Sequence, residues 1–193
     1  MSGFSRAASV CGLLLLALAA CEKETVYPTQ QDRLAKMNVD QVIYGLEHVM
    51  TNGGVRKANL HGDTAYFRDA DSRVDLKGVK LDFFNETTGA TSGSLTSKTG
   101  KYDMRTGAMT AIGNAVLTIQ GEKGPRVITS EELNYDVAGN RIWSSKPTVM
   151  KENGREVGRG SSFESDAKFQ NLTVRNAQGS GAAPTDGGGP VRF

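Results

Sequence analysis

The sequence predicts an all-β domain, an elongated sheet built from repeated antiparallel strand pairs. Its apolar residues fall in short alternating runs rather than in helical stripes, which is typical of half-buried strands. Turn-forming pairs rich in glycine and asparagine separate these runs. A unit led by a tyrosine recurs along the chain, and such recurrence indicates stacked structural units.

The first 20 residues are typical of a secretory signal peptide. Arg6 supplies the positive start, and residues 7–20 form an apolar run that is shorter than the about 20 residues needed to span a bilayer. The junction Leu18-Ala19-Ala20-Cys21 resembles the bacterial lipobox, which implies cleavage before Cys21 and attachment of lipid to its thiol. The alternatives are an ordinary signal peptide with an incidental cysteine, or an uncleaved anchor, and both also lead to the periplasm.

The rest of the chain divides into three parts. Residues 21–37 are mostly polar, contain Pro28 and are predicted to be a tether, whereas the glycine-rich residues 177–193 are predicted to be disordered. Between them, residues 38–176 are long enough for one domain with a single core. Cys11 leaves with the signal peptide, so acylation of Cys21 leaves no thiol for a disulfide or a metal site.

Charge gives no indication of a nucleic-acid partner. Arg6 leaves with the signal peptide, so 22 of the 23 basic residues face 21 acidic ones in the mature chain. No basic arm stands out along the sequence, and such an arm is the usual electrostatic sign of nucleic-acid binding. The chain is therefore predicted to bind no nucleic acid.

Residues 41–50 fit two interpretations. Their apolar residues have helical spacing and follow Asp40, a helix-capping type. These residues are Val42, Ile43, Leu46, Val49 and Met50. Gly45 interrupts the pattern, however, and the Asn52-Gly53 turn leads directly into the next run at residues 55–67. A strand is favoured over a helix.

The following runs alternate as strands do. One changes phase at Gly78, since Val74 and Leu76 precede the glycine and Val79, Leu81 and Phe83 follow it. Another follows Gly113-Asn114 and comprises Ala115, Leu117 and Ile119. Turn signals stand at residues 52–54, 88–89, 106–107, 138–140 and 153–154. Many short strands are predicted.

The recurring unit opens with an aromatic residue, passes through a turn and closes with an apolar run. It occupies residues 65–81, 101–117 and 134–149, and a shorter version occupies residues 163–174. The tyrosines Tyr66, Tyr102 and Tyr135 lie 36 and 33 residues apart. A hairpin-sized unit cannot bury its apolar face alone, so the units must stack or close over a common interior. A rolled, elongated β-sandwich is predicted.

The order of these segments resembles the OstA-like β-jellyroll of lipopolysaccharide transport proteins, and within that group the LptC family. The segments that carry the likeness lie within residues 38–176: Gly45-Leu46, Ala65-Tyr66, Leu76-Lys77-Gly78-Val79, Gly113-Asn114, residues 130–136, Arg141-Ile142-Trp143-Ser144, Gly158-Arg159-Gly160 and Asn171-Leu172-Thr173-Val174. The resemblance implies a V-shaped or tube-like jellyroll whose apolar interior takes acyl chains and whose edge strands add to partner jellyrolls. The best-known members keep an uncleaved N-terminal helix in the inner membrane, whereas this chain has a lipobox.

The resemblance also implies a function. The chain is expected to be a periplasmic component of lipopolysaccharide export, anchored to a membrane through lipidated Cys21, with the inner membrane favoured and the outer membrane also open. Its implied partners are lipopolysaccharide or a related glycolipid, other OstA-like jellyroll proteins and an inner-membrane ABC export complex. The alternative is a structural or assembly lipoprotein that uses the same fold to pair with envelope proteins and keeps a solid core.

Two sets of site residues are predicted. Those expected to line the interior are one alternation phase of each run and the aromatic residue that opens each unit: Tyr66, Val79, Leu81, Phe83, Tyr102, Ala115, Leu117, Ile119, Tyr135, Val149, Phe163, Leu172 and Val174. The second set is a partner edge at residues 169–176, which alternate without a proline: Phe169, Leu172, Thr173, Val174 and Arg175.

No catalytic, metal or cofactor site is predicted. His48 and His61 stand in no metal-binding pattern and are interpreted as strand or turn residues. Asp69, Asp71 and Asp75 lack the glycine and the closing glutamate of an EF-hand loop, so a solvated turn is favoured. The protein is expected not to be an enzyme.

Overall fold

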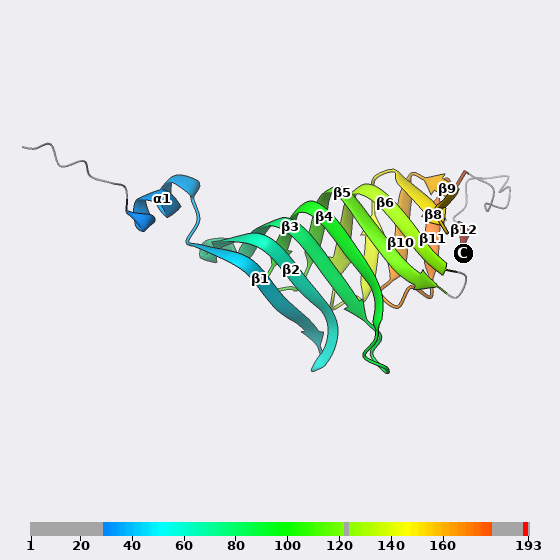
Figure 1. Cartoon of the computed structure of the whole chain (residues 1–193), viewed down its shortest axis with the longest axis horizontal. Coiled ribbons are helices and arrows are strands. Elements are labelled where there is room, and N and C mark those ends of the chain that lie inside the picture. The colour runs from blue at the N-terminus through cyan, green and yellow to red at the C-terminus, as the bar shows by residue number, and fades with distance from the viewer. Residues whose placement is uncertain (1–28, 122–123, 179–190, 193) are drawn as a thin grey trace, which may run out of the picture.

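The chain forms an elongated, folded β-sheet with a short helix beside its N-terminal end (Figure 1). The structure, a computed structural model, describes residues 29–121, 124–178 and 191–192. The predicted signal peptide, Cys21 and its lipid, the start of the tether and most of the glycine-rich tail lie outside the described residues.

The helix α1 (Gln30–Met37) occupies part of the segment predicted to be a tether. Thr29 and Asp32 form a capping box, in which each side chain accepts a hydrogen bond from the other residue's backbone N–H. The helix ends at Asn38, which has a left-handed φ of 52°. None of its residues is buried, so α1 adds nothing to the core. Overall polarity predicted the tether, but the capping pair identifies the helix.

In the part of the chain that the structure describes, twelve strands form one sheet, and every strand pair is antiparallel, which confirms the predicted class. The strands are β1 (Gln41–Asn52), β2 (Val55–Arg68), β3 (Arg73–Phe84), β4 (Thr91–Asp103), β5 (Met109–Gly121), β6 (Gly124–Asp136), β7 (Arg141–Ser144), β8 (Thr148–Glu152), β9 (Arg155–Gly160), β10 (Ser162–Asp166), β11 (Leu172–Arg175) and β12 (Val191–Arg192). A 3₁₀ turn, η1 (Asp69–Asp71), joins β2 to β3. The order is β1-β2-β3-β4-β5-β6-β7-β10-β11-β12, with β8 between β6 and β9.

The strand interpretation of residues 41–50 is confirmed, because β1 pairs with β2 from Gln41 opposite Phe67 to Asn52 opposite Val55. The predicted turns also join strands. In the β1–β2 turn, Gly53 and Gly54 have φ values of 58° and 77°. Glycine adopts this region without steric cost, which is why the turn carries it.

Six long strands bend along a common line. Gly45, Asp63, Gly78 and Lys98 have no cross-strand partner in the middle of β1 to β4, and the register shifts at Gly113-Asn114 in β5. Gly78 has a φ of 60°, and a Cβ added there would lie 1.8 Å from a carboxylate oxygen of Asp63. These positions, with Glu131 of β6 opposite the shifted residues, are called the fold line below.

At β6 the fold line becomes a fork. Residues 134–136 pair with β7, whereas residues 126–130 pair with β8. The sheet therefore consists of two half-sheets that share β1 to β6. The β7 half-sheet continues through β7, β10, β11 and β12, and the β8 half-sheet continues through β8 and β9.

The two half-sheets face each other. Phe83 lies in a row of paired residues that reaches Arg126 on β6 through Gly93 and Ile119. Tyr135 lies nine positions further along β6, about 30 Å away in a flat sheet. The rings of Phe83 and Tyr135 are nevertheless 5.1 Å apart, so the sheet is folded along its line. The predicted rolled sandwich is thus two halves of one sheet. Opposite the fold line, the free strand ends of the two half-sheets meet, and this seam, which includes the contact of Phe83 with Tyr135, is called the mouth below.

The space between the half-sheets is the hydrophobic core. Its largest fully buried side chains come from both halves: Tyr135, Phe83, Phe163, Leu60, Leu76, Leu81, Leu95, Leu117, Ile128, Leu133, Ile142 and Leu172. Fully burying one such side chain contributes about 1.5–3 kcal/mol. The core is continuous along the sheet, from Met50 of β1 to β11.

Candidate functional site

Most residues predicted to line the interior point into it. Eleven of them are buried between the half-sheets: Val79, Leu81, Phe83, Tyr102, Ala115, Leu117, Ile119, Tyr135, Phe163, Leu172 and Val174. The phase change at Gly78 is also present, because its positive φ lets Leu76 and Val79 both face inward. Sequence alternation thus identified the inner face of most strands.

Two of the predicted lining residues are wrong. Val149 lies on the outer face of β8, since its neighbours Thr148 and Met150 are the buried ones. Tyr66 also faces outward, where Lys77 lies 5.2 Å from its ring centroid, while Ala65 is fully buried beside it. Where consecutive residues are all apolar enough to be buried, alternation does not show which of them face inward. The cross-strand register decides which face each residue occupies.

The prediction missed a second group of interior residues. They share the inner face with the predicted ones: Leu60, Leu95, Ile128, Leu133, Ile142 and Met150. Leu133 stands two positions before Tyr135 and Ile142 pairs with Tyr135, so extending the alternation by two residues in each run identifies several of them.

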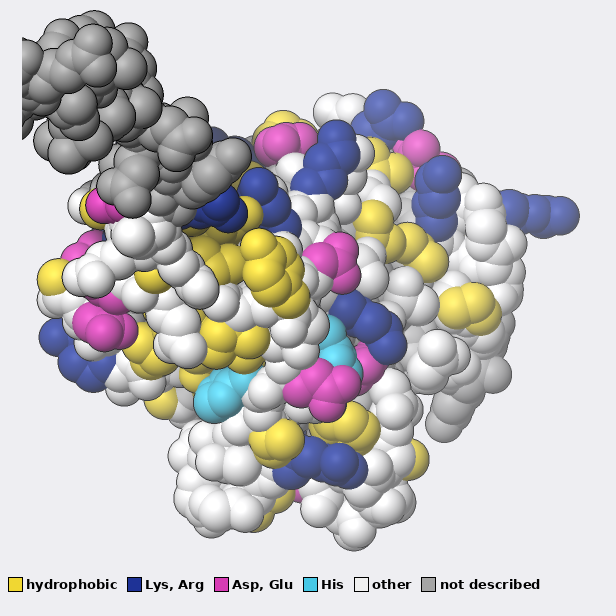
Figure 2. Space-filling view, turned by 60° about the vertical axis from the view of Figure 1, so that its left-hand side comes forward, with side chains coloured by type: hydrophobic (Ala, Val, Ile, Leu, Met, Phe, Trp, Pro, Cys, Tyr) yellow, Lys and Arg dark blue, Asp and Glu magenta, His cyan; other side chains and the backbone are white. Residues whose placement is uncertain are grey.

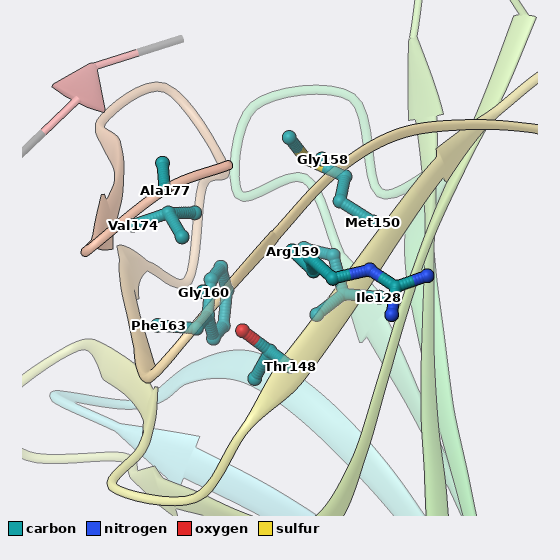
Figure 3. Close-up of a pocket in the computed structure, with 9 residues that line it drawn as sticks. All are labelled: Ile128, Thr148, Met150, Gly158, Arg159, Gly160, Phe163, Val174 and Ala177. Carbon is teal, nitrogen blue, oxygen red and sulfur yellow. The ribbon is translucent and has the colours of Figure 1, made fainter. Parts of the chain in front are cut away.

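The interior is filled by side chains. The edge-to-face contact of Phe83 with Tyr135 spans the two half-sheets, and burial raises the pKa of the Tyr135 hydroxyl. Near the C-terminal end, Ile128, Met150, Phe163 and Val174 converge on a cavity of ≈ 10 Å³ (Figure 3), room for about one water. An acyl chain could enter only if the half-sheets part or these side chains move.

The interior is incompletely covered beside β1. Ile43 and Leu46 are only partly buried against the core, and the exposed His48 reaches the hydroxyl of Tyr102 through a 2.9 Å hydrogen bond. Burial raises the pKa of that hydroxyl. Figure 2 shows hydrophobic side chains gathered on this side of the molecule, next to a histidine.

The two ends of the sheet differ in their edges. Within the described residues, β1 pairs only with β2, so one side of a 12-residue strand has no strand partner. Tyr44 and Val49 on this strand are 79% and 52% exposed. A long edge with exposed apolar side chains is ready to pair with another strand.

The predicted partner edge at residues 169–176 is not an open edge. Thr173 and Val174 pair with β10 on one side and with Arg192 and Val191 of β12 on the other. Phe169 lies before the strand, in the loop that leads to it, with a φ of 59°. Leu172 and Arg175 are in β11. Both ends of the segment predicted to be disordered therefore pair with the sheet, since β12 covers β11 and Gln178 forms an isolated bridge to Arg159 of β9.

The histidines and the acidic cluster have structural partners. His61 hydrogen-bonds Asn59 and lies 3.5 Å from a carboxylate oxygen of Glu47. In the acidic cluster, Asp75 forms an ion pair with Arg68. Within residues 29–121, 124–178 and 191–192, no three His, Cys, Asp or Glu side chains gather as metal ligands would. No helix in this part of the chain is long and apolar enough to cross a membrane.

Comparisons with known proteins point to one family. The family described as "Lipopolysaccharide-assembly, LptC-related" matches residues 8–178. A solved structure titled as LptH from Pseudomonas aeruginosa, the LptA homologous periplasmic component of the lipopolysaccharide transport device, is similar with 18% identity and a TM-score of 0.47. That match covers 69% of this chain and 93% of LptH. No curated protein matches the chain significantly.

Proposed function

The chain belongs to the LptC-related family of lipopolysaccharide assembly, and we propose that it shields acyl chains of lipopolysaccharide between its half-sheets and passes them to a neighbouring jellyroll. Family membership makes it a periplasmic transport component. The observation that carries the finer proposal is the continuous apolar core between two half-sheets that are joined by shared strands along one side.

Such a transfer needs no covalent chemistry. Exposing an acyl chain to water costs about 0.8 kcal/mol per CH₂, whereas moving it between two similar apolar interiors is nearly neutral. The free energy that drives transfer in one direction must then come from another protein, and an inner-membrane ABC export complex is the proposed source. The protein's own contribution is an apolar passage that keeps the acyl chain out of water.

The edge strand β1 is proposed as a docking edge. A neighbouring jellyroll that adds a strand there satisfies backbone groups along β1 and covers the half-buried Ile43 and Leu46. This assignment replaces the predicted edge at β11, which β12 already covers. Crosslinkers at Val49 and at Thr173 test it. Adducts with a jellyroll partner from Val49 alone support docking at β1, and adducts from Thr173 alone contradict it.

The anchor is proposed to be lipid on Cys21, with the inner membrane favoured. Acyl chains supply the membrane-binding energy of such a protein. Cys21→Ser is therefore expected to leave an uncleaved precursor or a protein released from membranes. Normal processing and membrane fractionation of this variant would contradict the lipoprotein assignment.

The second candidate is an assembly lipoprotein that pairs with envelope proteins and keeps a solid core. The filled interior, with Phe83 against Tyr135, favours it. Photo-crosslinking with lipopolysaccharide separates the two functions. A crosslinker at the buried Leu117 should give a lipopolysaccharide adduct, and one at its outward neighbour Val116 should not. Adducts from neither position would favour the assembly function.

A further inference from the structure

The loop at residues 166–171, between β10 and β11, crosses the mouth. Its conformation is set by Asp166, whose carboxylate accepts hydrogen bonds from the Gln170 backbone and the Asn171 side chain at 2.9 and 2.7 Å. The loop is joined to the β7 half-sheet by a 3.1 Å hydrogen bond from the Ala167 N–H to the Asn140 carbonyl. These hydrogen bonds fix the loop to that half-sheet.

Phe169 extends from this loop onto the opposite half-sheet. Its ring packs edge-on against Phe83, with centroids 5.4 Å apart. A Cβ added at Gly93 would lie 3.0 Å from this ring, so the glycine leaves the space that the ring uses. Phe169 also has a φ of 59°, an outlier for a bulky residue. Strain of this kind is held where the surroundings require it and often marks a functional position.

Cationic side chains surround the same point. Glu86 forms ion pairs with Lys57 at 2.8 Å and with Lys168 at 3.6 Å. The first of these hydrogen bonds holds the pKa of Glu86 below its ordinary value, so one carboxylate faces two ammonium groups. The nearby Arg126 is neutralised by Glu152 at 2.9 Å. The cluster of Lys57, Glu86 and Lys168 thus has one unbalanced positive charge.

Two hollows adjoin this cluster and share Asn85, Ser92 and Lys168 in their linings. The larger is ≈ 570 Å³ and is also lined by Ile119 and Phe169, a volume within the about 300–1,000 Å³ of ligand pockets. The smaller is ≈ 190 Å³. The hydroxyl of Ser92 is buried without a hydrogen-bond partner, although buried polar groups normally have one.

We propose that this part of the mouth is an entry port for an anionic amphiphile. An acyl chain would take the place of the Phe169 ring against Phe83 and Ile119, and the phosphate of its headgroup would bind Lys168, Lys57 and the Ser92 hydroxyl. The port deepens the proposed function and rests on it, since it gives acyl chains a lateral route into the interior. Opening it breaks side-chain contacts and leaves the backbone ladders of the half-sheets paired.

The test uses the full chain with a photo-crosslinker at one of two positions. Gln120 lines the larger hollow, and Leu117 lies deep in the interior. The probe is purified lipid A, compared with the same lipid after removal of its phosphates. The parent protein should form adducts from both positions, and removal of the phosphates should weaken the Gln120 adduct about tenfold, the factor that 1.4 kcal/mol represents.

Lys168→Glu should weaken the Gln120 adduct about tenfold with the phosphorylated lipid and have no effect with the dephosphorylated one. Lys151→Glu is the matched control, because it makes the same charge reversal at an exposed position on β8. Phe169→Ala should accelerate formation of the Leu117 adduct. Phe67→Ala, which removes another partly buried ring packed on the core, should not.

The outcomes separate the port from the proposed function. Adducts from Leu117 that are insensitive to Lys168, Phe169 and phosphate would overturn the port and leave the lipid-handling function standing. Adducts from neither position would overturn both. Phosphate-dependent adducts at Gln120 that Lys168→Glu weakens about tenfold, together with faster labelling of Leu117 in Phe169→Ala, would establish the port.

Discussion

The fold line and the mouth join the same two half-sheets by different means. Six continuous strands cross the fold line, with tight approaches such as that of Gly78 to Asp63. At the mouth, the contacts are made by side chains, including Phe83 with Tyr135 and Phe169 and a 3.3 Å hydrogen bond from Asn52 to the Val137 carbonyl. If the half-sheets part to admit lipid, as proposed, this difference makes the fold line the hinge and the mouth the side that opens.

The largest expected effect is at the mouth. Phe83→Ala removes a ring that is 1% exposed and contacts both Tyr135 and Phe169, so it should lower the free energy of unfolding by about 3–5 kcal/mol. Urea unfolding measures this loss. The control is Phe84→Ala at the adjacent position, where the ring is only partly buried and lies under Arg56, so a loss of about 1 kcal/mol is expected. Equal losses would mean that Phe83 does not join the half-sheets.

At the fold line, Gly78→Ala should cost about 1–3 kcal/mol through backbone strain, and the clash with Asp63 adds to it. Gly154→Ala is the matched control, because Gly154 also has a positive φ of 76° but open space around its Cβ position. Urea unfolding of both variants isolates the clash. If Gly154→Ala lowers the free energy of unfolding as much as Gly78→Ala does, the clash with Asp63 contributes nothing to the loss.

The buried hydroxyl of Tyr135 gives the mouth a pH dependence. Burial raises its pKa in the folded state, so above pH 10, the ordinary tyrosine value, the unfolded chain loses the proton first. Stability is therefore complete below about pH 10 and falls as pH rises, by about 1.4 kcal/mol per pH unit. Tyr135→Phe should reduce this slope in urea titrations at high pH, leaving the part that comes from Tyr102, whose pKa burial also raises; Tyr44→Phe, at a 79% exposed position, should leave the slope unchanged. An unchanged slope in Tyr135→Phe would contradict the assignment.

The smallest effect is expected outside both lines. Thr29→Ala removes the cap of α1 and should weaken that helix by about 1 kcal/mol. Because α1 buries no residue, the unfolding midpoint of the sheet should not change while the helical circular-dichroism signal decreases. A lower midpoint would show that α1 supports the half-sheets after all.

Local patterns predicted the parts of the fold that depend on neighbouring residues. The alternation around Gly78 identified both its strand and its change of phase, and the glycine turns identified the hairpins. The pairing of β12 with β11 joins residues separated by the glycine-rich segment, and no local pattern signals such a contact. The mouth loop was missed for the same reason, since Phe169 was interpreted as part of a strand and its partners Phe83 and Gly93 lie more than 70 residues earlier.

The pairing order has a consequence for how the chain folds. Each strand from β1 to β6 pairs with the next in sequence, so each of these pairs forms by closing one short hairpin loop, which costs less chain entropy than pairing distant segments. A chain that emerges N-terminus first can add one hairpin after another without waiting for its C-terminal part. Only the fork at β6 needs later segments, because β7 and β8 must find opposite ends of one strand. We expect the fork to be the slow step in folding and the last core element to become protected from hydrogen exchange.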